Sequence, residues 1–256
     1  MMRTFLAAAA ALSLSLSALA GEPGRGTGGS TTVGVGLSGE TLGDGVSDWS
    51  ERSVRVRRDF ERRKLVEAGV ASTRRFGLSD RQVNGTAVWP MGERFTGSVD
   101  ASYSGTHRIL PRHAVGAALQ YEFRPAWLVR GGARTTRYAE ARVNQASLAL
   151  EHYFSDYGMT VSWLPTHVFG VTAHSYALQG AWYYGDRDAV SLTLATGREA
   201  STIERGIVVL GKVESLGIGG RHVLSPAWSA NYGISYTRQA GLYTRKGLSI
   251  GLAYTY

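Results

Sequence analysis

Histidine, serine and carboxylate side chains are the residues of this sequence that could make a catalytic site. The best local set is His152 beside Ser155 and Asp156. Members of a catalytic triad normally come together from separate segments, so adjacency within one turn favours turn chemistry over nucleophilic catalysis. His167 and His174 flank one connection, but two ligands make no metal site. We therefore expect a chain that is not an enzyme, with no catalytic residue, no metal and no cofactor.

Arginine is the second residue type that could do chemistry, because its guanidinium group binds anions and carboxylates. Lys and Arg number 28 against 20 Asp and Glu, and lysine occurs only at Lys64, Lys212 and Lys246. The arginines are spread along the chain, and the N-terminus predicts export, so we expect no nucleic-acid partner. The chain has no cysteine, which excludes a disulfide scaffold and a thiolate metal site.

The first 20 residues predict a secretory signal peptide. A basic start at Arg3 is followed by an apolar run from Phe5 to Leu16 and by the small residues Ala18 and Ala20. The apolar run is short of the roughly 20 residues that a membrane-spanning helix needs. We expect a signal peptide over residues 1–20, a glycine-rich flexible arm over residues 21–30 and one folded domain over residues 31–256.

Apolar and polar residues alternate through this domain, as in strands with one apolar face. The pattern is clearest over residues 95–104 and 247–256. Charged residues make up 19% of the chain, below the roughly 25% of soluble domains, and they lie on the face opposite the apolar one. A soluble sandwich would also alternate, but its outer face would carry the charge. The pattern therefore favours an outer face that meets lipid.

Turn signals divide the domain into hairpins. Short breaks such as Pro90 to Glu93 recur roughly every 30 to 34 residues, one hairpin per repeat. Longer connections are expected between them, for example Phe76 to Asp80, Gly105 to Pro111, Thr166 to Thr172 and Arg198 to Gly206. Short turns on one side and longer loops on the other are typical of outer-membrane barrels.

Aromatic residues crowd the short turns and predict a girdle at one membrane interface. Its members are Trp89, Phe95, Phe123, Trp127, Phe154, Tyr157, Tyr184 and Trp228, with Tyr183 beside them. Trp49, Tyr103, Tyr138 and Tyr236 are candidates for the opposite girdle.

Counting segments predicts an all-β fold, a closed antiparallel transmembrane β-barrel of about fourteen strands. Twelve strands is the alternative, because the first pair is charge-rich and residues 207–224 break the pattern at Lys212 and Glu214. The last strand resembles the C-terminal insertion signal of outer-membrane barrels, which implies contact with the barrel-assembly machinery. The residues that carry this resemblance are Leu248, Ile250, Leu252, Tyr254 and Tyr256.

The chain resembles the YaiO-type outer-membrane barrel family over residues 31–256. The resemblance rests on Asp48-Trp49, on Arg58-Asp59-Phe60, on residues 183–187 and on Gly197-Arg198-Glu199. It implies the outer membrane of a Gram-negative bacterium, surface-exposed loops and no catalytic residue. Some relatives look associated with exported polysaccharide.

Strand parity places a set of charged residues in the lumen. The candidates are Arg55, Arg57, Asp100, Glu122, Arg130, Arg134 and Glu151. Either arginine and carboxylate pair into a lattice that stiffens and blocks the barrel, or surplus arginine lines a path for anions.

We expect a narrow pore or export channel for small anionic or saccharide solutes, with outer-membrane lipid as its surroundings. The alternatives are a closed structural barrel whose loops contact a partner, and an outer-membrane enzyme that modifies lipid. The enzyme would require His152 to act on lipid.

Overall fold

The computed structural model describes residues 8–9, 29–43, 48–61, 63–185, 187–204, 207–239 and 243–256. Two of these, Ala8–Ala9, form the short strand β1, which pairs with β12. Most of the predicted signal peptide and arm lies outside the described residues, so both stay predictions. The described part of the chain contains no helix long and apolar enough to span a membrane.

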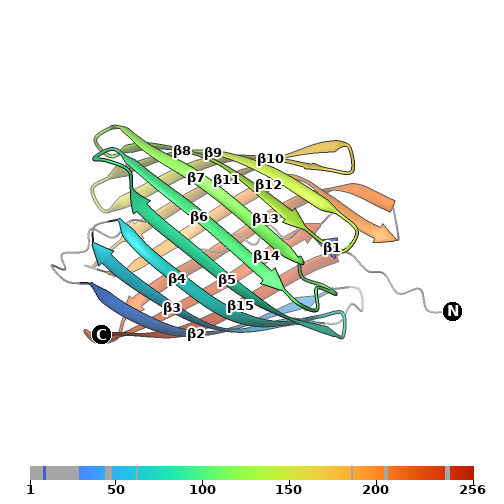
Figure 1. The fold of residues 1–256 in the computed structure, drawn as a ribbon, viewed down its shortest axis with the longest axis horizontal. Coiled ribbons are helices and arrows are strands. Elements are labelled where there is room, and N and C mark those ends of the chain that lie inside the picture. Colours follow the sequence, from blue (N-terminus) through green and yellow to red (C-terminus); the bar gives the residue numbers. More distant parts are fainter. Residues whose placement is uncertain are drawn as a thin grey trace.

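Strands β2 to β15 form one closed antiparallel barrel (Figure 1). Their bounds are β2 Ser30–Leu42, β3 Trp49–Glu61, β4 Lys64–Arg75, β5 Leu78–Pro90, β6 Phe95–Ser104, β7 His113–Arg124, β8 Trp127–Arg137, β9 Arg142–Phe154, β10 Tyr157–Val168, β11 Val171–Tyr183, β12 Ala189–Glu204, β13 Ile207–Val223, β14 Trp228–Gln239 and β15 Tyr243–Thr255. Each strand pairs with its neighbours in the chain, and β15 pairs with β2 to close the sheet. Closure satisfies the backbone groups that lipid cannot hydrogen-bond.

The predicted barrel of fourteen strands is confirmed, and the alternative of twelve is wrong. The charge-rich pair β2 and β3 is continuously hydrogen-bonded from Ser30–Asp59 to Glu40–Trp49. The segment with Lys212 and Glu214 forms β13, where these two side chains pair at 2.6 Å. Charge does not interrupt either strand, because each charged side chain faces the lumen or lies near a rim.

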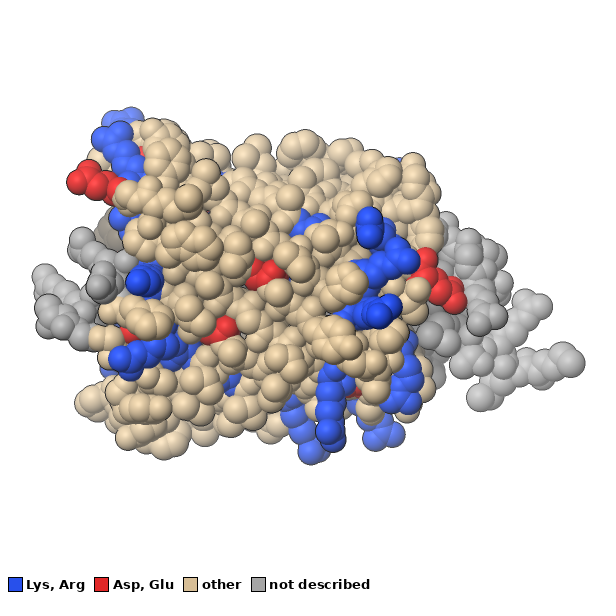
Figure 2. Space-filling model, viewed as in Figure 1, with Lys and Arg blue, Asp and Glu red and all other residues tan. Residues whose placement is uncertain are grey.

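The outer face of the barrel is apolar over its middle. In β10, for example, Tyr157, Met159, Val161 and Trp163 are exposed, and the cross-strand pairs of Val161 are Leu150 and Leu178. Figure 2 shows uncharged side chains over most of the middle of the barrel and basic side chains gathered near both ends. This distribution fits a membrane-spanning band bounded by two polar interfaces.

The two ends of the barrel differ in their connections. Both Ser30 and Tyr256 lie at one end, which we call the terminal rim; Tyr256 and Thr31 exchange backbone hydrogen bonds there. The opposite end, the distal rim, carries the longest connection, residues 105–112 between β6 and β7. Longer connections on one side mark the external face of outer-membrane barrels.

Three of the expected longer connections are wrong in extent. Phe76-Gly77 and Phe169-Gly170 are two-residue turns, and β12 continues to Glu204. In each turn both residues have positive φ, 52° and 74° in the first and 49° and 77° in the second. Two successive positive φ values define the type I′ turn, whose twist matches the flanking strands. The Phe-Gly pairs were the sequence signal for these turns.

Replacing Gly170 with alanine is expected to lower the free energy of unfolding by about 1 to 2 kcal/mol, because an L side chain pays for the left-handed conformation. Gly131→Ala is the matched control, since an added Cβ there meets nothing within 4 Å and φ is not positive. Urea unfolding in lipid vesicles measures both. Equal losses in the two variants would contradict the prediction.

Candidate functional site

The lumen holds the charged residues that the sequence predicted for it. All seven candidates lie on the strand positions that alternate with the lipid-facing ones, hence on the inner face. Arg57 binds Asp59, two residues further along β3, through Nε at 2.9 Å and Nη2 at 2.7 Å. Glu122 lies by the terminal rim, where its Oε1 accepts a hydrogen bond from the backbone N–H of Ala126 in the next turn at 3.4 Å.

Arg130 is held by two partners on neighbouring strands. Its Nη2 lies 2.7 Å from Oε1 of Glu151 on β9 and donates to Oε1 of Gln120 on β7 at 3.1 Å. The other carboxylate oxygen of Glu151 accepts a hydrogen bond from the Tyr153 hydroxyl at 3.5 Å. The positive charge of Arg130 is therefore balanced within the wall.

Arg134 pairs with Asp100, although β7 lies between their strands. The residue that separates them in the register is Gly116. A Cβ on Gly116 would lie 2.5 Å from Oδ1 of Asp100, so only glycine leaves room for this contact. The arginines of β8 that the sequence singled out are thus both engaged by carboxylates.

Arg55 is the predicted lumenal arginine that the wall does not neutralise. Its register neighbours are Gly34 on β2 and Gly69 on β4, neither of which carries a side chain. Within the described ranges, no carboxylate forms an ion pair with Arg55, and its side chain is exposed. This guanidinium is free to meet a solute in the lumen.

The paired residues of the inner wall remain in contact with solvent. The side chains of Arg57 and Asp59 are each 33% exposed, Arg130 is 28% exposed, and Arg134 and Asp100 are each 38% exposed. A barrel of eight strands is filled by its own side chains, whereas wider barrels enclose an aqueous space. The exposure of these groups indicates an aqueous space along the β3 and β6–β9 wall.

An aromatic and cationic cluster lies inside the distal rim. The Trp49 ring, 4% exposed, has the guanidinium carbons of Arg75 at 4.5 Å and Arg245 at 5.0 Å from its centroid. Phe76 and Tyr243 pack edge-on against the same ring. Such cation–π contacts place two positive charges against one desolvated ring. We call these five residues the distal cluster.

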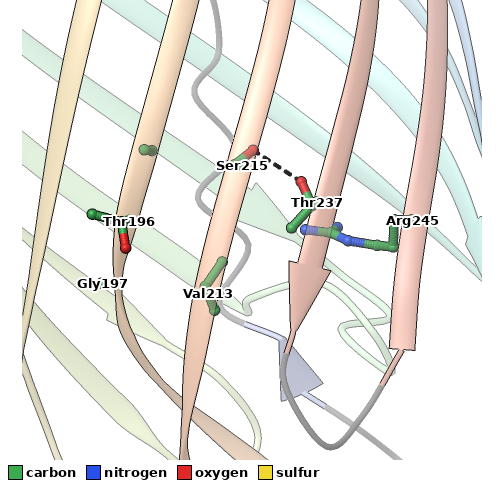
Figure 3. Close-up of a pocket in the computed structure, with 7 residues that line it drawn as sticks. Thr196, Gly197, Val213, Ser215, Thr237 and Arg245 are labelled. Carbon is green, nitrogen blue, oxygen red and sulfur yellow. Dashed lines mark hydrogen bonds between the residues drawn. The ribbon is translucent and has the colours of Figure 1, made fainter.

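Arg245 links the distal cluster to β2, the strand that pairs with β15 to close the barrel. Its Nη1 lies 3.3 Å from Oε2 of Glu40 on β2. Figure 3 shows its guanidinium pointing toward Thr237, whose hydroxyl is hydrogen-bonded to Ser215 at 2.9 Å. The space left beside these groups is about 10 Å³, the lower limit for one water. Arg245 is therefore fixed in place.

The position of Trp49 in the distal cluster shows that one prediction was wrong. The other contacts of the cluster were not predicted from the sequence. Trp49 was assigned to the distal aromatic girdle, but it faces inward, because position 49 shares the inner parity of Arg55 and Arg57. Parity alone could have placed Trp49 inside. The pairing of β15 with β2 brings Arg245 beside Trp49, and no local pattern reports that contact. Tyr103 and Tyr236 do lie outward near this rim.

The predicted girdle residues lie near the terminal rim, on or beside the outer face. Phe95 stacks on Tyr121 with ring centroids 4.6 Å apart, and Trp228 lies 5.1 Å from Tyr254. Tyr183, which the sequence grouped with them, instead faces the lumen beside Tyr153. All five residues of the predicted C-terminal insertion signal are exposed on the outer face: Leu248, Ile250, Leu252, Tyr254 and Tyr256.

His152 lies within this girdle. Its ring stacks on Trp127 at 3.9 Å, and its Nδ1 is 3.2 Å from the carbonyl oxygen of Ala126. His174 stacks on Trp163, and His167 is hydrogen-bonded to Thr172. Among the residues that the structure describes, no group of three or more His, Asp or Glu side chains could hold a metal ion.

Solved structures with the same fold are outer-membrane barrels. The translocator domain of the autotransporter NalP from Neisseria meningitidis has a TM-score of 0.54 at 13% identity and covers 92% of this chain and 91% of its own. An anion-selective porin from Comamonas acidovorans has a TM-score of 0.51 at 9% identity, with 89% and 98% covered. A bacterial polysaccharide outer membrane secretin has a TM-score of 0.53 at 9% identity, with 90% and 98% covered. At these identities the likeness shows the fold alone.

Sequence comparison gives the family. No curated protein sequence matches the chain. The model of the YaiO membrane beta barrel domain matches residues 30–202, more than half of the chain. The barrel and this match place the protein in the outer membrane of a Gram-negative bacterium. The chain belongs to the YaiO membrane beta-barrel family.

Proposed function

We propose that this outer-membrane barrel is a narrow diffusion or export channel for small anionic or saccharide solutes. The observation that carries the proposal is the solvent exposure of charged side chains on the inner wall, from 28% at Arg130 to 38% at Asp100 and Arg134. When charged side chains on the inner wall are this exposed to solvent, they border an aqueous path. Hydroxyl and guanidinium groups on such a wall are suited to saccharides and to carboxylates.

Arg55 is the residue that we propose sets charge preference. Carboxylates balance Arg57, Arg130 and Arg134, so these arginines contribute little net field. Arg55 lies between Gly34 and Gly69 and presents its charge to the lumen. We therefore expect a modest preference for anions rather than strict exclusion of cations.

Arg55→Ala is expected to shift the reversal potential in a salt gradient toward that of a non-selective pore. The measurement is planar-bilayer conductance of the refolded chain, in which the unchanged protein gives discrete steps and a reversal potential of the anion-selective sign. The single-channel conductance is expected to change little, because Arg55 lies beside Gly34 and Gly69 and the substitution removes one side chain from a wall that is already open there.

Arg55→Lys is the matched control, because it keeps the charge on a similarly long side chain and is expected to retain the anion preference. Two results count against the proposal. A folded barrel that gives no conductance steps would refute the channel, and an unchanged reversal potential in Arg55→Ala would remove Arg55 from selectivity.

A closed structural barrel is the second candidate. It is favoured by the pairing of Arg130 with Glu151 and of Arg134 with Asp100, and by the packed distal cluster. Such pairs stiffen a wall and need no solute. A silent barrel in the conductance experiment would support this candidate and direct attention to the distal connections.

The proposed function includes no catalytic step. It includes one contact with the barrel-assembly machinery during insertion. His152 stacks on Trp127 and its Nδ1 lies against a backbone carbonyl, so its ring serves the girdle rather than a nucleophile. The exposed strip from Leu248 to Tyr256 is the segment that we expect the barrel-assembly machinery to recognise. Any lipid hydrolysis by the purified protein would contradict the proposal that the barrel has no catalytic step.

A further inference from the structure

Three arginines lie close together on the outer face of the barrel near the distal rim. In the register, Ser72 of β4 pairs with Arg52 of β3 on one side and with Arg81 of β5 on the other. Two strand spacings separate Arg52 from Arg81, about 10 Å between backbones. Arg74 is the next outward residue of β4 beyond Ser72. Long arginine side chains reach one another over this distance.

These arginines have hydroxyl neighbours but no acidic ones. Arg74 pairs in the register with Ser50 and Ser79, so serines fill the positions between the cations. Across the part of the chain that the structure describes, no carboxylate forms an ion pair with Arg52, Arg74 or Arg81.

The nearest acids in the chain are occupied on the inner face. Asp80, next to Arg81, is buried and accepts hydrogen bonds from the backbone N–H groups of Ile109 and Leu110 at 2.7 and 3.0 Å. Glu51, next to Arg52, accepts a hydrogen bond from Thr73 at 2.8 Å. The three outward arginines therefore form a positive patch with hydroxyl donors and no internal counter-ion.

The apolar band of the membrane face is short beside this patch. On β3 the only outward-facing residues between Arg52 and Arg58 are Val54 and Val56. A cation next to acyl chains extends toward the headgroups or draws them inward by local thinning of the bilayer. Arg58, on the side of β3 toward the terminal rim, donates a hydrogen bond to the Thr31 hydroxyl at 2.7 Å.

The patch lies at the level where lipid headgroups meet the barrel. Val70 and Val83, the residues next to it toward the middle of the membrane, are both exposed to lipid. Tyr103, which pairs with Val83, is 58% exposed and lies in the register row next to the patch, so an interfacial aromatic residue borders it. Basic side chains gather at this end of the barrel, on the right in Figure 2.

We propose that Arg52, Arg74 and Arg81 form a binding site for the phosphate groups of a phosphorylated glycolipid in the outer leaflet. Guanidinium groups bind phosphate oxygens in a bidentate manner, and the adjacent serine hydroxyls donate further hydrogen bonds. A soluble anion would reach the patch as well, but Val70 and Val83 next to it are exposed apolar side chains on the outer face, which suit acyl chains that a lipid has and a free anion does not. The occupant is therefore the lipid.

The test is native mass spectrometry of the detergent-solubilised full-length protein titrated with lipid A and with chemically dephosphorylated lipid A. The unchanged protein is expected to retain lipid A and to release the dephosphorylated form. The triple variant Arg52→Gln, Arg74→Gln, Arg81→Gln is expected to bind lipid A roughly a hundredfold more weakly, as the loss of three cations near an anionic lipid predicts.

A charge-matched triple at the terminal rim, Arg58→Gln, Lys64→Gln, Arg94→Gln, is the control and is expected to bind lipid A as the unchanged protein does. Both triples are first shown to fold by circular dichroism and by the shift of unheated protein on a denaturing gel. Equal binding of the dephosphorylated lipid, equal losses in both triples, or displacement by millimolar inorganic phosphate would each overturn the proposal. Dissociation of a dimer in the first triple alone would assign the patch to a second copy of the chain instead. None of these outcomes depends on conductance.

Discussion

Trp49→Ala is expected to destabilise the barrel by about 3 to 5 kcal/mol, the usual cost of removing a buried tryptophan side chain. Trp49 is the centre of the distal cluster, where Arg75 and Arg245 contact its ring. The substitution leaves two guanidinium groups without their aromatic partner and leaves a cavity between β2, β3 and β15. Because Arg245 also pairs with Glu40 on β2, the loss falls on the seam that closes the barrel.

The same substitution is expected to raise single-channel conductance if the lumen conducts, because a large ring leaves the distal mouth. Urea unfolding in lipid vesicles gives the stability, and planar-bilayer recording gives the conductance. Trp89→Ala is the control, since Trp89 faces outward near the terminal rim. The prediction fails if the two tryptophan variants lose equal stability, or if Trp49→Ala conducts no better than the unchanged protein.

Val161→Arg is expected to lower the free energy of unfolding by roughly 2 to 4 kcal/mol, the cost of an arginine on the lipid face near the bilayer midplane. Val161 lies near the middle of β10, is 53% exposed and has Leu150 and Leu178 as register neighbours. None of these neighbours offers a partner for a guanidinium group, so the new charge faces acyl chains.

Ser162→Arg is the matched control, one residue away on the opposite face. Its neighbours Ala149 and Ala177 are small, so a long side chain extends into the lumen. Stability is expected to stay near that of the unchanged protein, while the reversal potential shifts further toward anion selectivity. If Ser162→Arg destabilised as much as Val161→Arg, the assignment of inner and outer faces would be wrong.

Strand parity was enough to predict the faces of the barrel. Leu248, Ile250 and Leu252 alternate with small residues in the sequence, and in the structure all three are exposed on the outer face. Likewise, Arg130 and Arg134 were placed on the inner face from their positions alone. Parity succeeds because side chains alternate with a period of two along every strand, whatever its partners are.

Turn geometry was less accessible. Residues 76–80 and 166–172 were expected to be longer connections between the short turns. The structure continues the strands to Arg75 and Val168 and turns the chain within Phe-Gly pairs. A turn in which both φ values are positive depends on two residues only, so the surrounding composition was a poor guide.

The sequence by itself determined the class of this protein, because strands that alternate between an apolar face and a polar face, with the outward charges near the ends, suit a lipid-facing barrel. It also placed seven charged residues on the inner face, although it missed Arg75 and Arg245 of the distal cluster. The tertiary structure alone decided which of these charged side chains form ion pairs or contacts with one another. Asp100 reaches Arg134 across Gly116, Arg55 is left between two glycines, and Arg245 reaches Trp49 through the pairing of the last strand with the first. The physical reason is that parity is local to each strand, whereas neighbours across strands depend on register and on closure of the sheet.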